Sequence, residues 1–114
     1  MHPAPFPATV LMVTTTVASA ADAQRLAAGA VGERLAACVQ VEQIASHYVW
    51  KGRPHDEAEW RLACKTTAHA APALCAWLRA QHPYEVPQLL AQPVQASEDY
   101  AQWVTEQVQA APGD

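Results

Sequence analysis

Hydrophobic and polar positions alternate with two different periods along the chain, and each period predicts a type of element. The β-branched run from Thr9 to Thr16 predicts a first strand. Apolar residues then recur at three- and four-residue steps, which predicts an amphipathic helix that Ser19 or Asp22 can cap. The residues on its apolar face are Ala23, Leu26, Ala27, Ala30, Val31 and Leu35. From Cys38 to Trp50 the period becomes two, which predicts a second strand.

A hairpin and a second helix are predicted after this strand. The sequence Lys51-Gly52-Arg53-Pro54 favours a turn, and a return strand is predicted over Glu57 to Thr67. The return strand alternates between one face with Trp60, Leu62 and Cys64 and another with Glu59, Arg61, Ala63 and Lys65. A helix is predicted from Ala71 to Ala80, because Pro72 suits a first turn and His82-Pro83 stops the helix.

The remaining elements complete a recognisable order. Val86 to Val94 predicts a last strand, which Pro87 and Pro93 confine to a sheet edge. A final helix is predicted from Glu98 to Val108. The order strand, helix, strand, strand, helix, strand is that of an α+β, ferredoxin-like split βαβ sandwich, here with an extra C-terminal helix. Both crossovers are expected to be right-handed. We expect a single domain over residues 9–108, between a flexible Pro-rich tail (1–8) and a flexible tail (109–114).

Composition narrows the class of protein. The 114 residues are 51% hydrophobic and 16% charged, which fits one compact domain. A formal charge of -4 and only 7 Lys plus Arg argue against nucleic acid or an anionic membrane as a partner. Charged residues are sparser than the roughly 25% usual in soluble domains, so a monomer would expose much apolar surface. This low charge indicates an oligomer.

The first apolar run and the cysteines bear on the cellular compartment. Residues 10–17 are followed by Ala18-Ser19-Ala20, a pattern that a secretory signal also has. No Lys or Arg precedes the run, so we favour a strand over a cleaved signal. The run is also too short to cross a bilayer as a helix. Cys38, Cys64 and Cys75 form no CxxC pair, which speaks against a disulfide framework or a zinc knuckle. We therefore expect a cytoplasmic protein.

Four short strings occur in a characteristic order. They are Glu-Arg-Leu-Ala-Ala-Cys-Val at 33–39, Tyr-Val-Trp-Lys-Gly at 48–52, Lys-Thr-Thr at 65–67 and His-Pro-Tyr-Glu-Val-Pro at 82–87. In these strings the chain closely resembles the CutA family of divalent-cation tolerance proteins. The resemblance continues through Ala91-Gln92-Pro93-Val94 and Asp99-Tyr100, and so covers about residues 9 to 108.

The resemblance implies a ferredoxin-like subunit whose extended central hairpin holds together a tight homotrimer. It also implies binding of copper (Cu²⁺) or another divalent metal, with a role in divalent cation tolerance and the response to metal ions. No organic cofactor and no enzymatic reaction are implied. Cys38 with His82, or Lys65 with Glu85, supplies residue types used in catalysis, but neither pair has a diagnostic spacing. The alternative is a non-catalytic trimeric scaffold or small-ligand sensor without a physiological metal, with an unknown protein partner.

Three residues are candidate metal ligands. Cys38 matches the cysteine of the family pattern, and a thiolate is a soft donor suited to Cu(I). His82 and Glu85 flank Pro83, and their nitrogen and oxygen donors suit Cu(II) or Zn(II). Structural roles are the alternative, with the cysteines as small buried hydrophobes and the turn residues bonded to neighbouring backbone groups. The other histidines have no ligand-like spacing to one another and are interpreted as surface or loop residues: His2, His47, His55 and His69.

Tyr48, Trp50 and Lys65, with Tyr84 of the turn, are candidates for a pocket where one subunit meets another. Lys65 would attract a small anionic ligand on which the aromatic rings could stack. The same side chains can instead pack in the trimer interface. We favour packing, because aromatic hairpins bury much apolar area in homo-oligomers.

Overall fold

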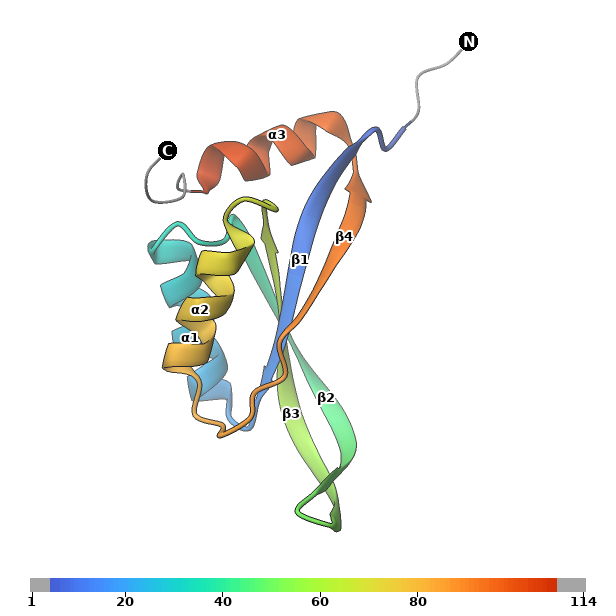
Figure 1. The fold of residues 1–114 in the computed structure, drawn as a ribbon, viewed down its shortest axis with the longest axis vertical. Helices are drawn as coiled ribbons and strands as arrows, with labels where there is room; N and C mark the ends of the chain where they lie inside the picture. Colours follow the sequence, from blue (N-terminus) through green and yellow to red (C-terminus); the bar gives the residue numbers. More distant parts are fainter. Residues whose placement is uncertain (1–4, 109–114) are drawn as a thin grey trace.

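The fold is a four-stranded antiparallel sheet with two helices on one face and a third helix across one end (Figure 1). The structure, a computed structural model, describes residues 5–108. Its elements are β1 (Ala8–Val17), α1 (Ala20–Gly32), β2 (Cys38–Trp50), β3 (Arg53–Thr66), α2 (Ala71–Gln81), β4 (Leu90–Ala96) and α3 (Glu98–Gln107). The strand order β2-β3-β1-β4 leaves β2 and β4 as the two edges. This is the predicted α+β, ferredoxin-like architecture. Residues 1–4 and 109–114 of the predicted tails lie outside the described residues.

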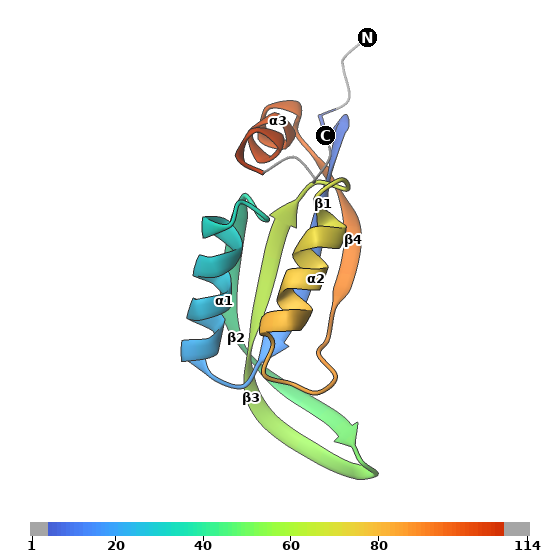
Figure 2. The same ribbon diagram turned by 60° about the vertical axis from the view of Figure 1, so that its left-hand side comes forward.

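The core lies between the sheet and the pair α1 and α2, which stand side by side on one face (Figure 2). The larger apolar side chains that are fully buried in this layer are Val13, Val17, Leu26, Leu62, Cys64, Leu74 and Leu78. Those on each strand are separated by two or four residues and those on α2 by four, as the hydrophobic pattern predicts. Burial of one such aliphatic side chain contributes about 1.5–3 kcal/mol, so this layer is the main source of stability.

Helix α1 begins at a side-chain cap and ends earlier than its hydrophobic pattern predicts. The Ser19 hydroxyl accepts a hydrogen bond from the Asp22 amide at 3.1 Å, so Ser19 is the cap of the two candidates. The apolar pattern continues to Leu35, but Arg34 has a φ of 59°. This left-handed conformation stops the helix and turns the chain toward β2.

Helix α3 crosses the end of the sheet and is held there by packing and by Arg34. Val104 is fully buried in a small cluster that includes Val10 of β1. The Arg34 guanidinium donates from Nε to the Gln107 carbonyl and from Nη2 to the Glu106 carbonyl, each at 3.0 Å. These two bonds satisfy carbonyl groups that the end of a helix leaves without partners.

The hairpin is longer on its return side than predicted. Strands β2 and β3 pair along their whole length. The turn has two residues, Lys51 with a φ of 51° and Gly52 with a φ of 75°, and two positive φ values are the signature of a type I′ turn. The return strand therefore starts at Arg53 and not at Glu57, because so tight a turn leaves no unpaired residues.

Part of this hairpin projects beyond the body of the molecule (Figures 1 and 2). Pairing of β3 with β1 starts only at Trp60, so residues 44–59 form a two-stranded ribbon. The ribbon contributes to a long axis of 54 Å. Among the described residues, no helix is both long and apolar enough to cross a membrane.

The last strand was predicted at Val86 to Val94, but it starts later, at Leu90, and ends at Ala96. Pairing between β1 and β4 begins at Thr14 opposite Leu90 and extends to Ala96. The physical reason is that the next two residues of β1, Thr15 and Thr16, contact the His82 imidazole and not a strand. Residues 83–89 therefore form a loop around the end of β1.

Candidate functional site

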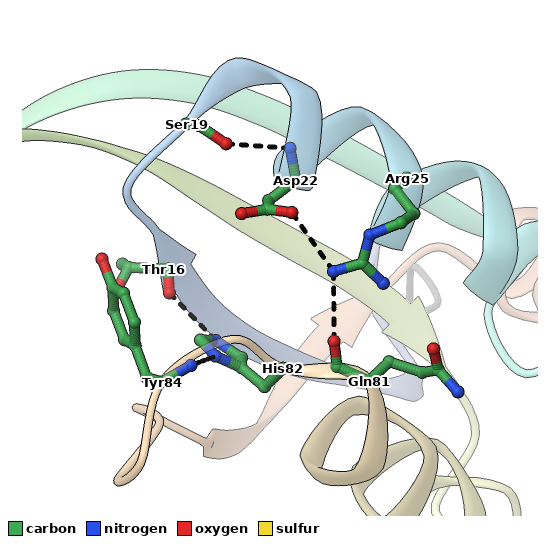
Figure 3. A network of polar contacts seen from close by, with 7 residues as sticks. All are labelled: Thr16, Ser19, Asp22, Arg25, Gln81, His82 and Tyr84. Atoms are coloured by element: carbon green, nitrogen blue, oxygen red, sulfur yellow. Dashed lines mark hydrogen bonds and ion pairs between the residues drawn. The ribbon is translucent and has the colours of Figure 1, made fainter.

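The loop between α2 and β4 starts with His82, whose imidazole is held at both ring nitrogens (Figure 3). Nε2 lies 3.0 Å from the Thr16 carbonyl oxygen and 3.0 Å from the Thr15 hydroxyl oxygen. Nδ1 accepts a hydrogen bond from the Tyr84 amide at 3.1 Å. Since Nδ1 accepts, Nε2 carries the proton of the neutral ring and donates to Thr16. Burial lowers the pKa of His82, while the Thr16 bond and the nearby Asp22 carboxylate act in the opposite direction.

The Tyr84 side chain fastens this loop to β3. Its hydroxyl donates to Oε2 of Glu59 at 2.6 Å, and its ring centre lies 4.9 Å from that of His82. Glu59 is only 7% exposed, although it belongs to the face of β3 predicted to be polar. Burial and the Glu59 bond both raise the pKa of Tyr84 above its ordinary value. The buried Glu59 carboxylate is therefore hydrogen-bonded to the Tyr84 hydroxyl in place of water.

A second set of contacts joins α1 to the start of the same loop. The Arg25 guanidinium lies 3.3 Å from the Asp22 carboxylate and donates to the Gln81 carbonyl at 3.1 Å (Figure 3). Gln81 is the last residue of α2, where carbonyl groups lack helical partners. Arg25 thus fixes the end of α2 immediately before His82.

The predicted metal ligands do not form one cluster in this chain. Glu85 is exposed on the loop. Cys38 is half-buried and pairs with Lys65 of β3. His82 contacts Thr16 of β1, and Thr16 pairs with Arg61, which is four residues before Lys65 on β3. Within residues 5–108, no three His, Cys, Asp or Glu side chains are close enough together to hold a metal ion.

The residues predicted to form a pocket are also divided. Tyr48 and Trp50 lie on the projecting ribbon, where a shallow hollow of about 550 Å³ is present. Its lining residues are His47, Tyr48, Val49, Pro54, His55 and Asp56. Lys65 lies at the other end of β3, where its amine contacts the Gln40 side chain. A pocket that combines Lys65 with the ribbon aromatics would require a second subunit.

The ribbon contains two histidine–carboxylate pairs that the sequence did not predict. His47 Nε2 lies 3.7 Å from an Asp56 oxygen, and His55 Nδ1 lies 3.7 Å from a Glu57 oxygen. Both histidines were interpreted as isolated surface residues. The two-residue turn sets the register that places His47 opposite Asp56, so the turn was the signal from which this pair could have been found.

Comparison with known families settles the relationship of the chain. The CutA1 divalent ion tolerance protein family matches residues 11–107. The chain belongs to this family. The match includes all four strings on which the CutA resemblance was based, and that prediction is confirmed.

Individual CutA proteins agree with this assignment. The divalent-cation tolerance protein CutA of Thermus thermophilus is 40% identical over 97 residues, which cover 83% of this chain and 94% of that protein. Protein CutA of Homo sapiens is 43% identical over 84 residues, or 72% of this chain and 47% of the human protein. The chain thus spans about half the length of the human relative. The structure of CutA from Synechococcus elongatus has a TM-score of 0.85 and 37% identity, and covers 90% of this chain and 92% of that one.

Proposed function

We propose that this CutA1-family protein acts as a homotrimer in divalent-cation tolerance and binds divalent cations without catalysing a reaction. The observation that carries the proposed assembly is the apolar surface of the single chain. Large hydrophobic side chains on both edge strands are exposed: Val41, Tyr48, Val49 and Trp50 on β2, and Leu90 and Val94 on β4. Exposed apolar edge strands invite pairing with another chain.

The position of the two edges favours a closed ring. Strands β2 and β4 lie on opposite sides of the sheet, so β2 of one copy can meet β4 of the next. Such head-to-tail contacts close into a ring when the rotation between copies permits it. In a ring of three, Tyr48 and Trp50 pack in the interface, where Lys65 of a neighbouring copy could complete the predicted pocket.

The proposed cation ligands at the turn are His82 and Glu85, whereas Cys38 of the same chain lies apart from them beside Lys65. Neutral imidazole is a good ligand for Cu(II) and Zn(II). The Tyr84 amide now occupies the acceptor nitrogen of His82, so a cation must displace this bond to bind there. We therefore expect modest affinity at the turn. The three free thiols are compatible with the proposed cytoplasmic location.

Light scattering and calorimetry test the two parts of the proposal separately. Light scattering should give a mass of about three times the 12.3 kDa subunit. A monomer at all concentrations would overturn the proposed assembly. Calorimetric titration with Cu²⁺ or Zn²⁺ should show binding that His82→Ala weakens and Glu85→Gln weakens less. A trimer that binds neither ion would support the alternative of a scaffold or small-ligand sensor.

A further inference from the structure

The two histidine–carboxylate pairs of the ribbon lie on opposite faces of it. Side chains alternate along a strand, so His55 and Glu57 of β3 share one face while Asp56 points to the other, toward His47 of β2. The nitrogen–oxygen distance is 3.7 Å in both pairs. The ribbon therefore carries two sets of the same donor types at the same separation.

Only one of the two pairs is held in place by a neighbouring side chain. Tyr48 lies opposite His55 in the register, and the two rings are stacked, with centres 5.2 Å apart and planes inclined by 12°. The stacked Tyr48 ring thus orients the imidazole of this pair. By contrast, the side chains of His47 and Asp56 are each 73% exposed.

The separation of His55 and Glu57 fits a shared metal ion. Bonds from Zn²⁺ to histidine nitrogen and carboxylate oxygen are each about 2.0–2.2 Å long. In tetrahedral coordination two such donors lie about 3.4 Å apart, so a small side-chain rotation that closes the 3.7 Å separation by about 0.3 Å lets both bind one ion.

We propose that His55 Nδ1 and Glu57 Oε1 bind one divalent cation of the Zn²⁺ or Cu²⁺ type, with Tyr48 as a positioning residue and water in the remaining coordination positions. Glu59 lies two residues further along the same face of β3 and adds negative charge near the site. The inference shares with the proposed function the expectation that this protein encounters divalent cations. It requires neither the trimer nor binding at His82.

Zinc calorimetry on matched variants tests this site. Every protein carries His2→Ala, because His2 lies outside the described residues and would compete as an imidazole ligand. His55→Ala should abolish the ribbon site, and Glu57→Gln should weaken it. Tyr48→Leu removes the ring that stacks on His55, so affinity should fall about tenfold, as for other groups that orient metal ligands. His47→Ala is the matched control, and its zinc affinity should equal that of the parent.

An anomalous difference map from zinc-soaked crystals supplies the second measurement, with a peak expected between His55 and Glu57. Loss of binding in His55→Ala with full binding in His47→Ala supports the proposal. Equal effects of His55→Ala and His47→Ala, or full binding by both, would overturn it. If His82→Ala alone abolishes binding, the ribbon site is refuted while the turn site of the proposed function stands.

Discussion

Replacing Tyr84 by Phe should destabilise the protein, because it removes the hydrogen bond to the Glu59 carboxylate. Hydrogen bonds to charged groups contribute about 1.5–3 kcal/mol, and the loss is largest when the remaining partner is buried. Glu59 is 7% exposed, so little water can replace the tyrosine hydroxyl. We therefore expect the free energy of unfolding to fall by about 1.5–3 kcal/mol per chain. For a domain of this size, that corresponds to a decrease in Tm of about 6 °C or more.

Denaturant unfolding, followed by circular dichroism at one protein concentration, measures this loss. A fixed concentration is needed because association adds to apparent stability. Tyr100→Phe is the control, since Tyr100 is 37% exposed on α3, and its effect should be below about 0.5 kcal/mol. Glu59→Gln should cost less than Tyr84→Phe, because the amide oxygen still accepts the bond. The reasoning is refuted if Tyr84→Phe leaves stability unchanged.

Three further predictions concern pH, packing and thiols. Burial lowers the pKa of His82, so its neutral form is favoured in the folded protein. The free energy of unfolding should therefore fall as pH drops below about 6.5, where the unfolded chain binds the proton more readily. His82→Gln should flatten that part of the stability–pH curve. A Cβ at Gly29 would lie 2.6 Å from the Trp77 ring, so Gly29→Ala should move this ring and alter tryptophan fluorescence, whereas Gly32→Ala, which meets open space, should leave fluorescence unchanged. Burial raises the pKa of Cys64 to about 12, so its labelling should be the slowest of the three thiols in the folded protein, and denaturation should expose three free thiols; fast labelling of native Cys64 would contradict its burial.

Periodicity predicted the elements of the fold, while contacts between distant residues determined where the predictions failed. The alternating residues of β2 and the apolar face of α1 identify those elements from local sequence alone. The start of β4 depends on His82, which reaches β1 across 66 residues of sequence. Glu59 has the sequence context of an exposed strand residue, yet it is buried and accepts a hydrogen bond from the Tyr84 hydroxyl. No local pattern contains either contact.

In the candidate site, too, local sequence indicated some features, while contacts between distant residues determined the others. The resemblance to CutA identified the string that contains His82, and the imidazole indeed lies at a structured turn. The structural alternative, that turn residues bond to neighbouring backbone groups, holds for His82, whose nitrogens contact the Thr16 carbonyl and the Tyr84 amide. The His55 and Glu57 pair was not predicted, because the spacing between histidines carries no information on a carboxylate two residues away. Alternate residues on one strand face are close in space, and Tyr48 was recognisable as their neighbour only once the register was known.

The projecting ribbon also has a consequence for local unfolding. A two-stranded hairpin is marginal on its own, and within the described part of the chain residues 44–59 pair with no third strand. The amide hydrogens of the ribbon should therefore exchange with solvent through small openings that leave the helix-covered sheet intact. Any ligand or second copy that binds only the closed ribbon slows this exchange in proportion to its occupancy. The most easily opened part of the fold is thus also the part whose motion reports most directly on binding.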